Sequence, residues 1–145
     1  MINGSISSLL SVHSGVPQGS ILGPLLFVLF IDDICEMISE GTELALYADD
    51  TKIWREILCD NDQIVLQNDI NSLFDWSVRN KMNFHPDKCK VVPVTNKSII
   101  CHSPLYELNG IFLNYERSEK DLGVIINGKL SWNSQCEVLI QIPKG

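Results

Sequence analysis

The 145-residue sequence predicts one α+β domain in which an antiparallel sheet is backed by helices. Three observations favour this fold class. Residues 44–54 place apolar runs on both sides of a short polar centre, which is typical of a β-hairpin. Residues 62–80 repeat apolar side chains at helical spacing. Asn109-Gly110 lies between two further apolar runs and is a strong hairpin signal. The length is sufficient for one such domain with a real core.

Composition indicates a folded, intracellular and soluble protein. Apolar residues make up 45% of the chain and there are only six prolines, which argues against disorder. The five cysteines include no Cys-x-x-Cys pair, as expected for free thiols in a reducing compartment. No signal peptide is evident, and the apolar run at 21–31 is shorter than the ~20 residues of a membrane span. The net charge of −7 disfavours tight nucleic-acid binding by this chain alone.

The first part of the chain predicts a short strand, a loop and a helix. Leu9–Val12 is the candidate strand. A loop that contains Gly15, Pro17 and Gly19 follows it. Leu25 to Ile38 is predicted to be a largely buried helix that ends before Gly41. Pro24 falls in the first turn of that helix, where a missing N–H is harmless.

Two adjacent acids, Asp49 and Asp50, form the polar centre of the first hairpin. Strand residues alternate between faces, so the two carboxylates need not act alike. Paired carboxylates beside a core repel each other and favour a cation, and oxygen ligands suit Mg²⁺ best. The alternative from these two residues alone is a solvated Asp-Asp turn.

A long helix is predicted from about Asp62 to Asn80, with Asn61 or Asp62 as its cap. One face repeats apolar or small side chains and is expected to pack on a sheet: Leu66, Ile70, Leu73, Phe74 and Ser77, widened by Trp76 and Val78. Three acids are interpreted as solvated charges at the helix end and outer face: Asp60, Asp62 and Asp69. Cys89–Val94 is predicted to be a strand near a sheet edge, because Pro93 cannot donate a hydrogen bond.

Two motifs resemble a known family when taken together. The first is Gly15-Val16-Pro17-Gln18-Gly19-Ser20, continued by Leu22-Gly23-Pro24-Leu25-Leu26-Phe27; the second is Tyr47-Ala48-Asp49-Asp50. In this order they resemble blocks B and C of reverse transcriptases, most closely the non-LTR (LINE-type, jockey-like) retrotransposon enzymes. Retroviral enzymes share the Pro-Gln-Gly and Tyr-x-Asp-Asp portions but not the long apolar continuation. The resemblance implies an incomplete polymerase palm and RNA-directed DNA polymerisation.

The resemblance also implies roles for the acidic hairpin. Asp49 would be the principal ligand of Mg²⁺ (or Mn²⁺), and Asp50 a weaker or structural partner. Tyr47 would lie near the growing end of the primer. Gln18 and Gly19 would line the nucleotide pocket, where a glycine lets backbone approach a ligand; the alternative is that the glycine only shapes a turn.

A later segment resembles block D, whose lysine is proposed to protonate the leaving pyrophosphate. Lys88 matches that position best and Lys90 next, while a solvated lysine is the alternative for either. The hairpins of residues 105–126, with Leu130-Ser131-Trp132, resemble the primer-grip region. Residues 1–134 are therefore expected to be partial palm and the start of that region, and 135–145 an unmatched tail.

The family's first catalytic block, a strand with a metal-binding Asp, is expected upstream of Gly15, but residues 1–14 contain no Asp or Glu. The implied partners are an RNA template, a DNA primer and dNTPs, without a membrane, and the implied location is the cytoplasm and nucleus. Weak nucleic-acid binding and no activity are expected of this fragment alone. Two alternatives remain: a catalytically dead remnant or domesticated binding module, and an unrelated Mg²⁺ phosphohydrolase that leaves the Pro-Gln-Gly-Ser block unexplained.

Overall fold

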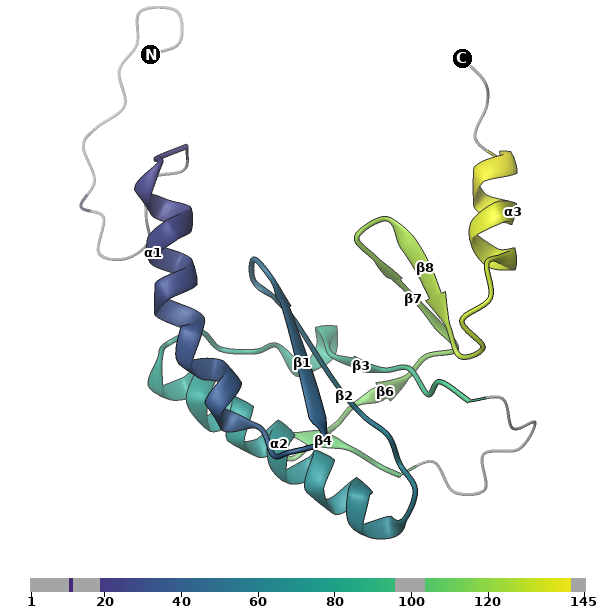
Figure 1. Cartoon of the computed structure of the whole chain (residues 1–145), viewed down its shortest axis with the longest axis horizontal. Coiled ribbons are helices and arrows are strands. Elements are labelled where there is room, and N and C mark those ends of the chain that lie inside the picture. Colours follow the sequence, from purple (N-terminus) through teal and green to yellow (C-terminus); the bar gives the residue numbers. More distant parts are fainter. Residues whose placement is uncertain (1–10, 12–18, 96–103, 142–145) are drawn as a thin grey trace, which may run out of the picture. The chain divides into compact units, whose positions relative to one another are not determined.

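A computed structural model describes residue 11, residues 19–95 and residues 104–141 (Figure 1). The chain divides into two compact units, Met1–Asp33 and Ile34–Gly145, and each is described by itself. Of the strand predicted at Leu9–Val12, only residue 11 is described, and Gln18 lies outside the described residues.

The first unit contains helix α1, Leu22–Ile31, and the chain continues as the 3₁₀-helix η1, Asp32–Met37. The sequence prediction of one helix from Leu25 to Ile38 was wrong at both ends. Ser20 Oγ accepts a hydrogen bond from the Gly23 N–H at 3.0 Å, which supports a start upstream of Pro24. The α-helix ends where two carboxylates follow, because the negative end of a helix dipole disfavours acids.

The prediction that this helix is largely buried was also wrong. Of the α1 residues, only Gly23 and Ile31 are buried. Apolar side chains surround the helix on all sides, and no other complete helix or strand is described in its unit for them to pack on. An all-round apolar helix needs such neighbours before it can be buried.

The second unit begins with the predicted hairpin, which is confirmed. Strands β1, Thr42–Tyr47, and β2, Asp50–Arg55, pair antiparallel with Tyr47 opposite Asp50. We call residues 42–55 the acidic hairpin. It is followed by the long helix α2, Asp60–Arg79, which contacts β2 (Figure 1).

Helix α2 is capped differently from the sequence prediction. The N-cap is Cys59, not Asn61 or Asp62, and Asp62 is the third helical residue of a capping box. Asp62 Oδ2 accepts hydrogen bonds from the Leu58 and Cys59 N–H groups, both at 3.1 Å. The Cys59 thiol also donates to Asp62 Oδ2 at 3.3 Å, and this bond, followed by the two backbone bonds, lowers the pKa of Asp62. A carboxylate at this position satisfies N–H groups that a helix leaves free.

Short elements make up the rest of the unit. They are η2 Pro86–Lys88, β3 Lys90–Val91, β4 Glu107–Leu108, β5 Ile111–Phe112, β6 Asn114–Tyr115, β7 Ser118–Asp121, β8 Val124–Asn127 and α3 Asn133–Gln141. The described helices and strands confirm the predicted α+β class. The strands form four two-stranded sheets, of which three are antiparallel, and β3 pairs with β6 in parallel. The strand expected over Cys89–Val94 is shortened to β3, since Pro93 cannot extend a ladder.

The core of this unit lies where α2 meets β4. Ile70, Tyr106 and Leu108 are buried together. Partly buried residues pack around them: Leu66, Phe74, Phe84, Cys89, Val91, Leu113 and Tyr115. The apolar stripe predicted for α2 is therefore confirmed as core. Two details were wrong, because Val78 is exposed and Asp69 is buried.

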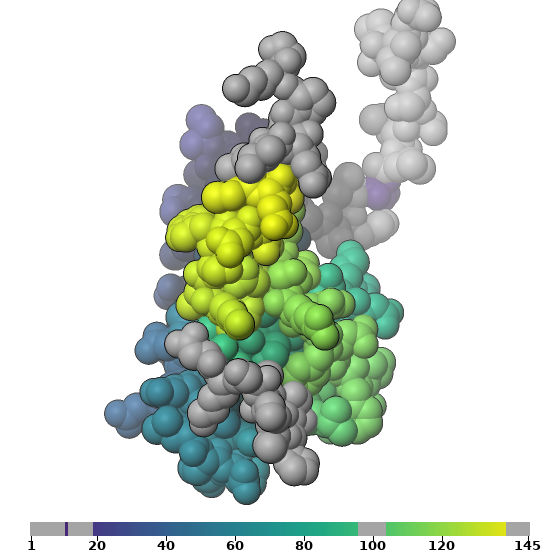
Figure 2. Space-filling view, turned by 90° about the vertical axis from the view of Figure 1, so that its right-hand side faces the viewer, coloured from purple at the N-terminus to yellow at the C-terminus, as the bar shows by residue number. Residues whose placement is uncertain are grey.

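The last helix lies against the second long hairpin, β7–β8 (Figure 2). Gln135 of α3 accepts a hydrogen bond from the Ile125 N–H at 2.9 Å and donates to the Gly123 carbonyl at 3.3 Å. The segment after residue 134, expected as an unmatched tail, thus includes a helix that packs on this hairpin.

Candidate active site

The two adjacent carboxylates lie at the closed end of the acidic hairpin. Tyr47 and Asp50 are the last paired residues, so Ala48 and Asp49 form a two-residue turn. Ala48 has a φ of +51°, the left-handed conformation that two-residue hairpin turns require at their first position. The local sequence therefore holds both acids at the tip of the hairpin.

The turn gives the two acids different positions, as the sequence analysis expected. Asp49 lies in the turn, whereas Asp50 begins β2 and shares a face with its partner Tyr47 and with Lys52, two residues on. The three candidate site residues at the tip, Tyr47, Asp49 and Asp50, are exposed. Within the described residues, neither carboxylate has a hydrogen bond or ion pair that would occupy it. Both are open to a cation.

These oxygen donors fit a hard metal ion. Mg²⁺ takes one or two protein carboxylates and completes its shell with water and phosphate oxygens. Within residues 19–95 and 104–141, no group of three or more His, Cys, Asp or Glu side chains is arranged to hold a metal ion. Metal binding by Asp49 and Asp50 stays a prediction, and it would require further ligands.

The two candidate lysines differ in their surroundings. Lys90 Nζ donates to Glu119 Oε2 at 2.7 Å, and this hydrogen bond raises the pKa of Lys90. A raised pKa makes an ammonium a poorer proton donor. Lys88 lies on η2 and is exposed, and its side chain forms no hydrogen bond or ion pair with another described residue. The hydrogen bond to Glu119 makes Lys90 the weaker candidate, and the role of Lys88 as a general acid stays a prediction.

The loop residues predicted to line the nucleotide pocket belong to the first unit. Gly19 has a φ of +81°, and nothing in the described structure lies within 4 Å of the place a Cβ would occupy. The positive φ by itself favours glycine at this position. Gln18 is outside the described residues. A pocket shared by these residues and Tyr47 stays a prediction.

Sequence reasoning missed several residues that connect the acidic hairpin to its surroundings. One is Arg55 of β2, which pairs with Asp62 of α2, an acid that was expected to be solvated. Lys52 forms an ion pair with Asp121 of β7. Asp69 of α2, predicted to be solvated, is 2% exposed and hydrogen-bonds the open end of the hairpin. A signal for Asp69 was present: it follows Leu66 by three residues and precedes Leu73 by four, the spacing of the buried face.

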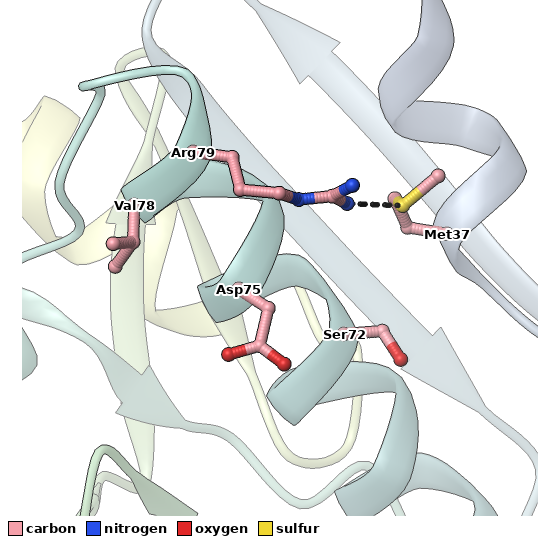
Figure 3. A pocket seen from close by; sticks show the side chains of 5 residues that line it. All are labelled: Met37, Ser72, Asp75, Val78 and Arg79. Carbon is pink, nitrogen blue, oxygen red and sulfur yellow. Dashed lines mark hydrogen bonds between the residues drawn. The ribbon is translucent and has the colours of Figure 1, made fainter.

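A shallow pocket elsewhere in the second unit has a volume of about 440 Å³ (Figure 3). It is lined by Met37, Ser72, Asp75, Val78 and Arg79. Arg79 Nη2 donates to Met37 Sδ at 3.5 Å, as the dashed line in Figure 3 marks. None of these residues belongs to the candidate site, so this pocket is separate from it.

A hairpin with two carboxylates at its turn, supported by a long helix, is an arrangement suited to metal-dependent phosphoryl transfer. Comparison with known proteins defines the class. The family model described as "Reverse transcriptase (RNA-dependent DNA polymerase)" matches residues 1–139. The chain belongs to the reverse transcriptase family.

Among the described residues, no helix is long and apolar enough to cross a membrane.

The chain is similar to curated retrotransposon polymerases. The "RNA-directed DNA polymerase from mobile element jockey" of Drosophila melanogaster is 30% identical over 91% of this chain, and that of Drosophila funebris is 32% identical over 90%. The "Probable RNA-directed DNA polymerase from transposon BS" of Drosophila melanogaster is 30% identical over 83%. The chain spans about 15% of the length of the jockey proteins and 14% of the transposon BS protein. No solved structure matches the chain significantly.

The predicted resemblance to jockey-like, LINE-type enzymes is thereby confirmed. An unrelated phosphohydrolase no longer needs to be considered, because family membership accounts for the Pro-Gln-Gly-Ser block as well as the acidic turn.

Proposed function

We propose that this chain is part of the palm of a retrotransposon RNA-directed DNA polymerase. The observation that carries the proposal is the Tyr47–Asp50 tip, which presents two exposed carboxylates at the closed end of a hairpin in a chain of the reverse transcriptase family. The substrates would be an RNA template, a DNA primer and dNTPs. Such an enzyme would bind its RNA and DNA substrates in the cytoplasm and nucleus.

The reaction would be a nucleotidyl transfer. The primer 3′-hydroxyl would attack the α-phosphate of a dNTP, forming a phosphodiester bond and releasing pyrophosphate. Asp49 and Asp50 would hold Mg²⁺ (or Mn²⁺), with Asp49 the principal ligand. When bound, such ions neutralise the charge that develops on the phosphoryl group.

Other residues would orient the substrates and move protons. Gln18 and Gly19 would line the nucleotide pocket, and Tyr47 would support the primer end at the same tip. Lys88 would donate a proton to the leaving pyrophosphate. Lys90 is the weaker candidate because Glu119 already holds its ammonium group.

The test is template-primer extension by the protein that the continuous reading frame around this chain encodes. We expect extension with Mg²⁺, a loss of at least about a hundredfold in Asp49→Asn, and no change in Asp60→Asn. Asp60 is a suitable control because it is an exposed acid on α2, outside the acidic hairpin.

Two results would contradict the proposal. Undiminished extension by Asp49→Asn would place the metal ligands elsewhere. No extension by the wild-type protein would favour a non-catalytic remnant or binding module, a reading with which the net charge of −7 agrees.

A further inference from the structure

Asp69 is buried although it carries a charged side chain. It lies on α2, and only 2% of its surface is exposed. Its Oδ1 accepts hydrogen bonds from the Ser39 N–H at 3.0 Å and the Ser39 hydroxyl at 2.7 Å. Its Oδ2 accepts one from the Thr42 hydroxyl at 2.6 Å. A buried carboxylate is costly unless it is satisfied in this way, so the three bonds hold the start of β1 on α2.

A second set of contacts ties β2 to the same place. Arg55 is the register partner of Thr42 at the open end of the acidic hairpin. Its Nη1 donates to the Thr42 hydroxyl at 3.1 Å and to the Glu40 carbonyl at 2.9 Å. Its Nε pairs with Asp62 Oδ1 at 3.2 Å. Both strands are thus fastened to α2 at the open end, with Asp69 as the buried member of the network.

The fastened end and the acidic turn lie at opposite ends of the hairpin. At a rise of about 3.4 Å per residue, Thr42 is about 17 Å from Tyr47 along β1. Over this length a tilt of about 4° moves the tip by about 1 Å. A displacement of that size at a reacting centre can cost about a hundredfold in rate. The angle at the open end therefore decides where the carboxylates lie.

We propose that Asp69 is a positioning residue for the Asp49-Asp50 turn: through Ser39 and Thr42, its carboxylate sets the angle at which the acidic hairpin leaves α2. Asp69 touches no substrate. Its effect on catalysis rests on the proposed function, whereas its effect on the hairpin angle does not.

The primary test measures the angle directly in the full 145-residue chain. Residual dipolar couplings of backbone amides in β1–β2 and in α2 are fitted to one alignment tensor for the wild type, Asp69→Asn and Thr42→Val. Asp75→Asn is the matched control, because Asp75 is an exposed acid on the same helix. We expect a common tensor for the wild type and the control, and separate tensors for both network variants.

Thr42→Val removes a single hydroxyl, so it decides the question if Asp69→Asn does not fold. Hairpin couplings in Thr42→Val that still fit the α2 tensor would overturn the proposal. That result would mean that Asp69 contributes only to the stability of the fold and does not set the angle of the hairpin.

The catalytic consequence is tested in the polymerase encoded by the surrounding reading frame. Asp69→Asn should lower kcat by about tenfold or more while KM for dNTP stays within about twofold, since orientation and not nucleotide contact is lost. An unchanged kcat in Asp69→Asn, together with one alignment tensor that fits both its hairpin and α2, would also overturn the proposal. If the wild-type protein has no activity, the proposed function fails, but the dipolar couplings still decide the role of Asp69.

Discussion

Lys52 on β2 forms an ion pair with Asp121 on β7. Lys52 follows Asp50 by two residues and shares its face of the strand. Asp121 immediately precedes the Leu122-Gly123 turn of the β7–β8 hairpin. The pair therefore joins two hairpins close to their closed ends, and it connects the acidic turn to a segment that is distant in the sequence.

The pair is expected to add little stability and to be sensitive to salt. The Lys52 and Asp121 side chains are 38% and 21% exposed, and pairs of this kind contribute roughly 0.2–1 kcal/mol. A double-mutant cycle of Lys52→Met and Asp121→Asn, measured by urea unfolding, should give a coupling free energy in that range at low salt and less at high salt. Lys120→Met is the control, as an exposed lysine beside Asp121. No coupling at low salt would show that the pair does not hold the hairpins together.

The acidic turn should bind Mn²⁺ only weakly in the isolated chain. Two exposed carboxylates are available, and no third ligand joins them among the described residues. Paramagnetic broadening of amide signals during a Mn²⁺ titration should centre on the turn of the acidic hairpin and decrease in Asp49→Asn. Asp60→Asn should leave it unchanged. Tight binding that survives Asp49→Asn would show that the ligands lie elsewhere.

Tyr115 should make stability depend on pH in the alkaline range. Burial and the neighbouring Tyr106 raise the pKa of Tyr115 from its usual value near 10 to about 12, and its hydroxyl donates to the Pro104 carbonyl. Because the pKa of Tyr115 is higher in the folded state than in the unfolded state, the contribution of its protonated hydroxyl to the free energy of unfolding is complete below pH 10. This contribution is lost as the pH rises through about 12.

Urea unfolding between pH 10 and 12 should therefore show a falling free energy for the wild type and a shallower fall for Tyr115→Phe. Tyr47→Phe serves as the control, since Tyr47 is exposed. Equal slopes for the wild type and Tyr115→Phe would contradict this assignment.

The isolated 145-residue chain should not extend a primer. It spans about 15% of its jockey relatives, its net charge of −7 disfavours duplex binding, and its described acids form no complete metal site. An extension assay with Mg²⁺ and with Mn²⁺ compares the chain with its Asp49→Ala/Asp50→Ala variant. Extension by the first and not by the second would disprove the prediction and would require another carboxylate, such as Asp32 or Asp33, to complete the site.

The sequence by itself determined the features that short segments encode. The Asp49-Asp50 turn follows from two apolar runs and a two-residue connection, all within residues 44–54. The second hairpin follows in the same way: Asn109 and Gly110 have φ values of +54° and +74°, as their residue types favour. The family, too, could be identified from two motifs, because each is contiguous in the chain.

Only the tertiary structure decided which polar groups are paired and buried. Asp69 looked like a solvated acid, yet it hydrogen-bonds Ser39, thirty residues away in the sequence. The sequence placed Lys88 ahead of Lys90 by resemblance alone, and only the structure shows that Glu119 lies beside Lys90. Helical and strand patterns fix which face a side chain lies on, but a charged residue becomes buried only if distant segments supply hydrogen-bond partners. Which segments do so depends on how the elements pack, and no local pattern records it.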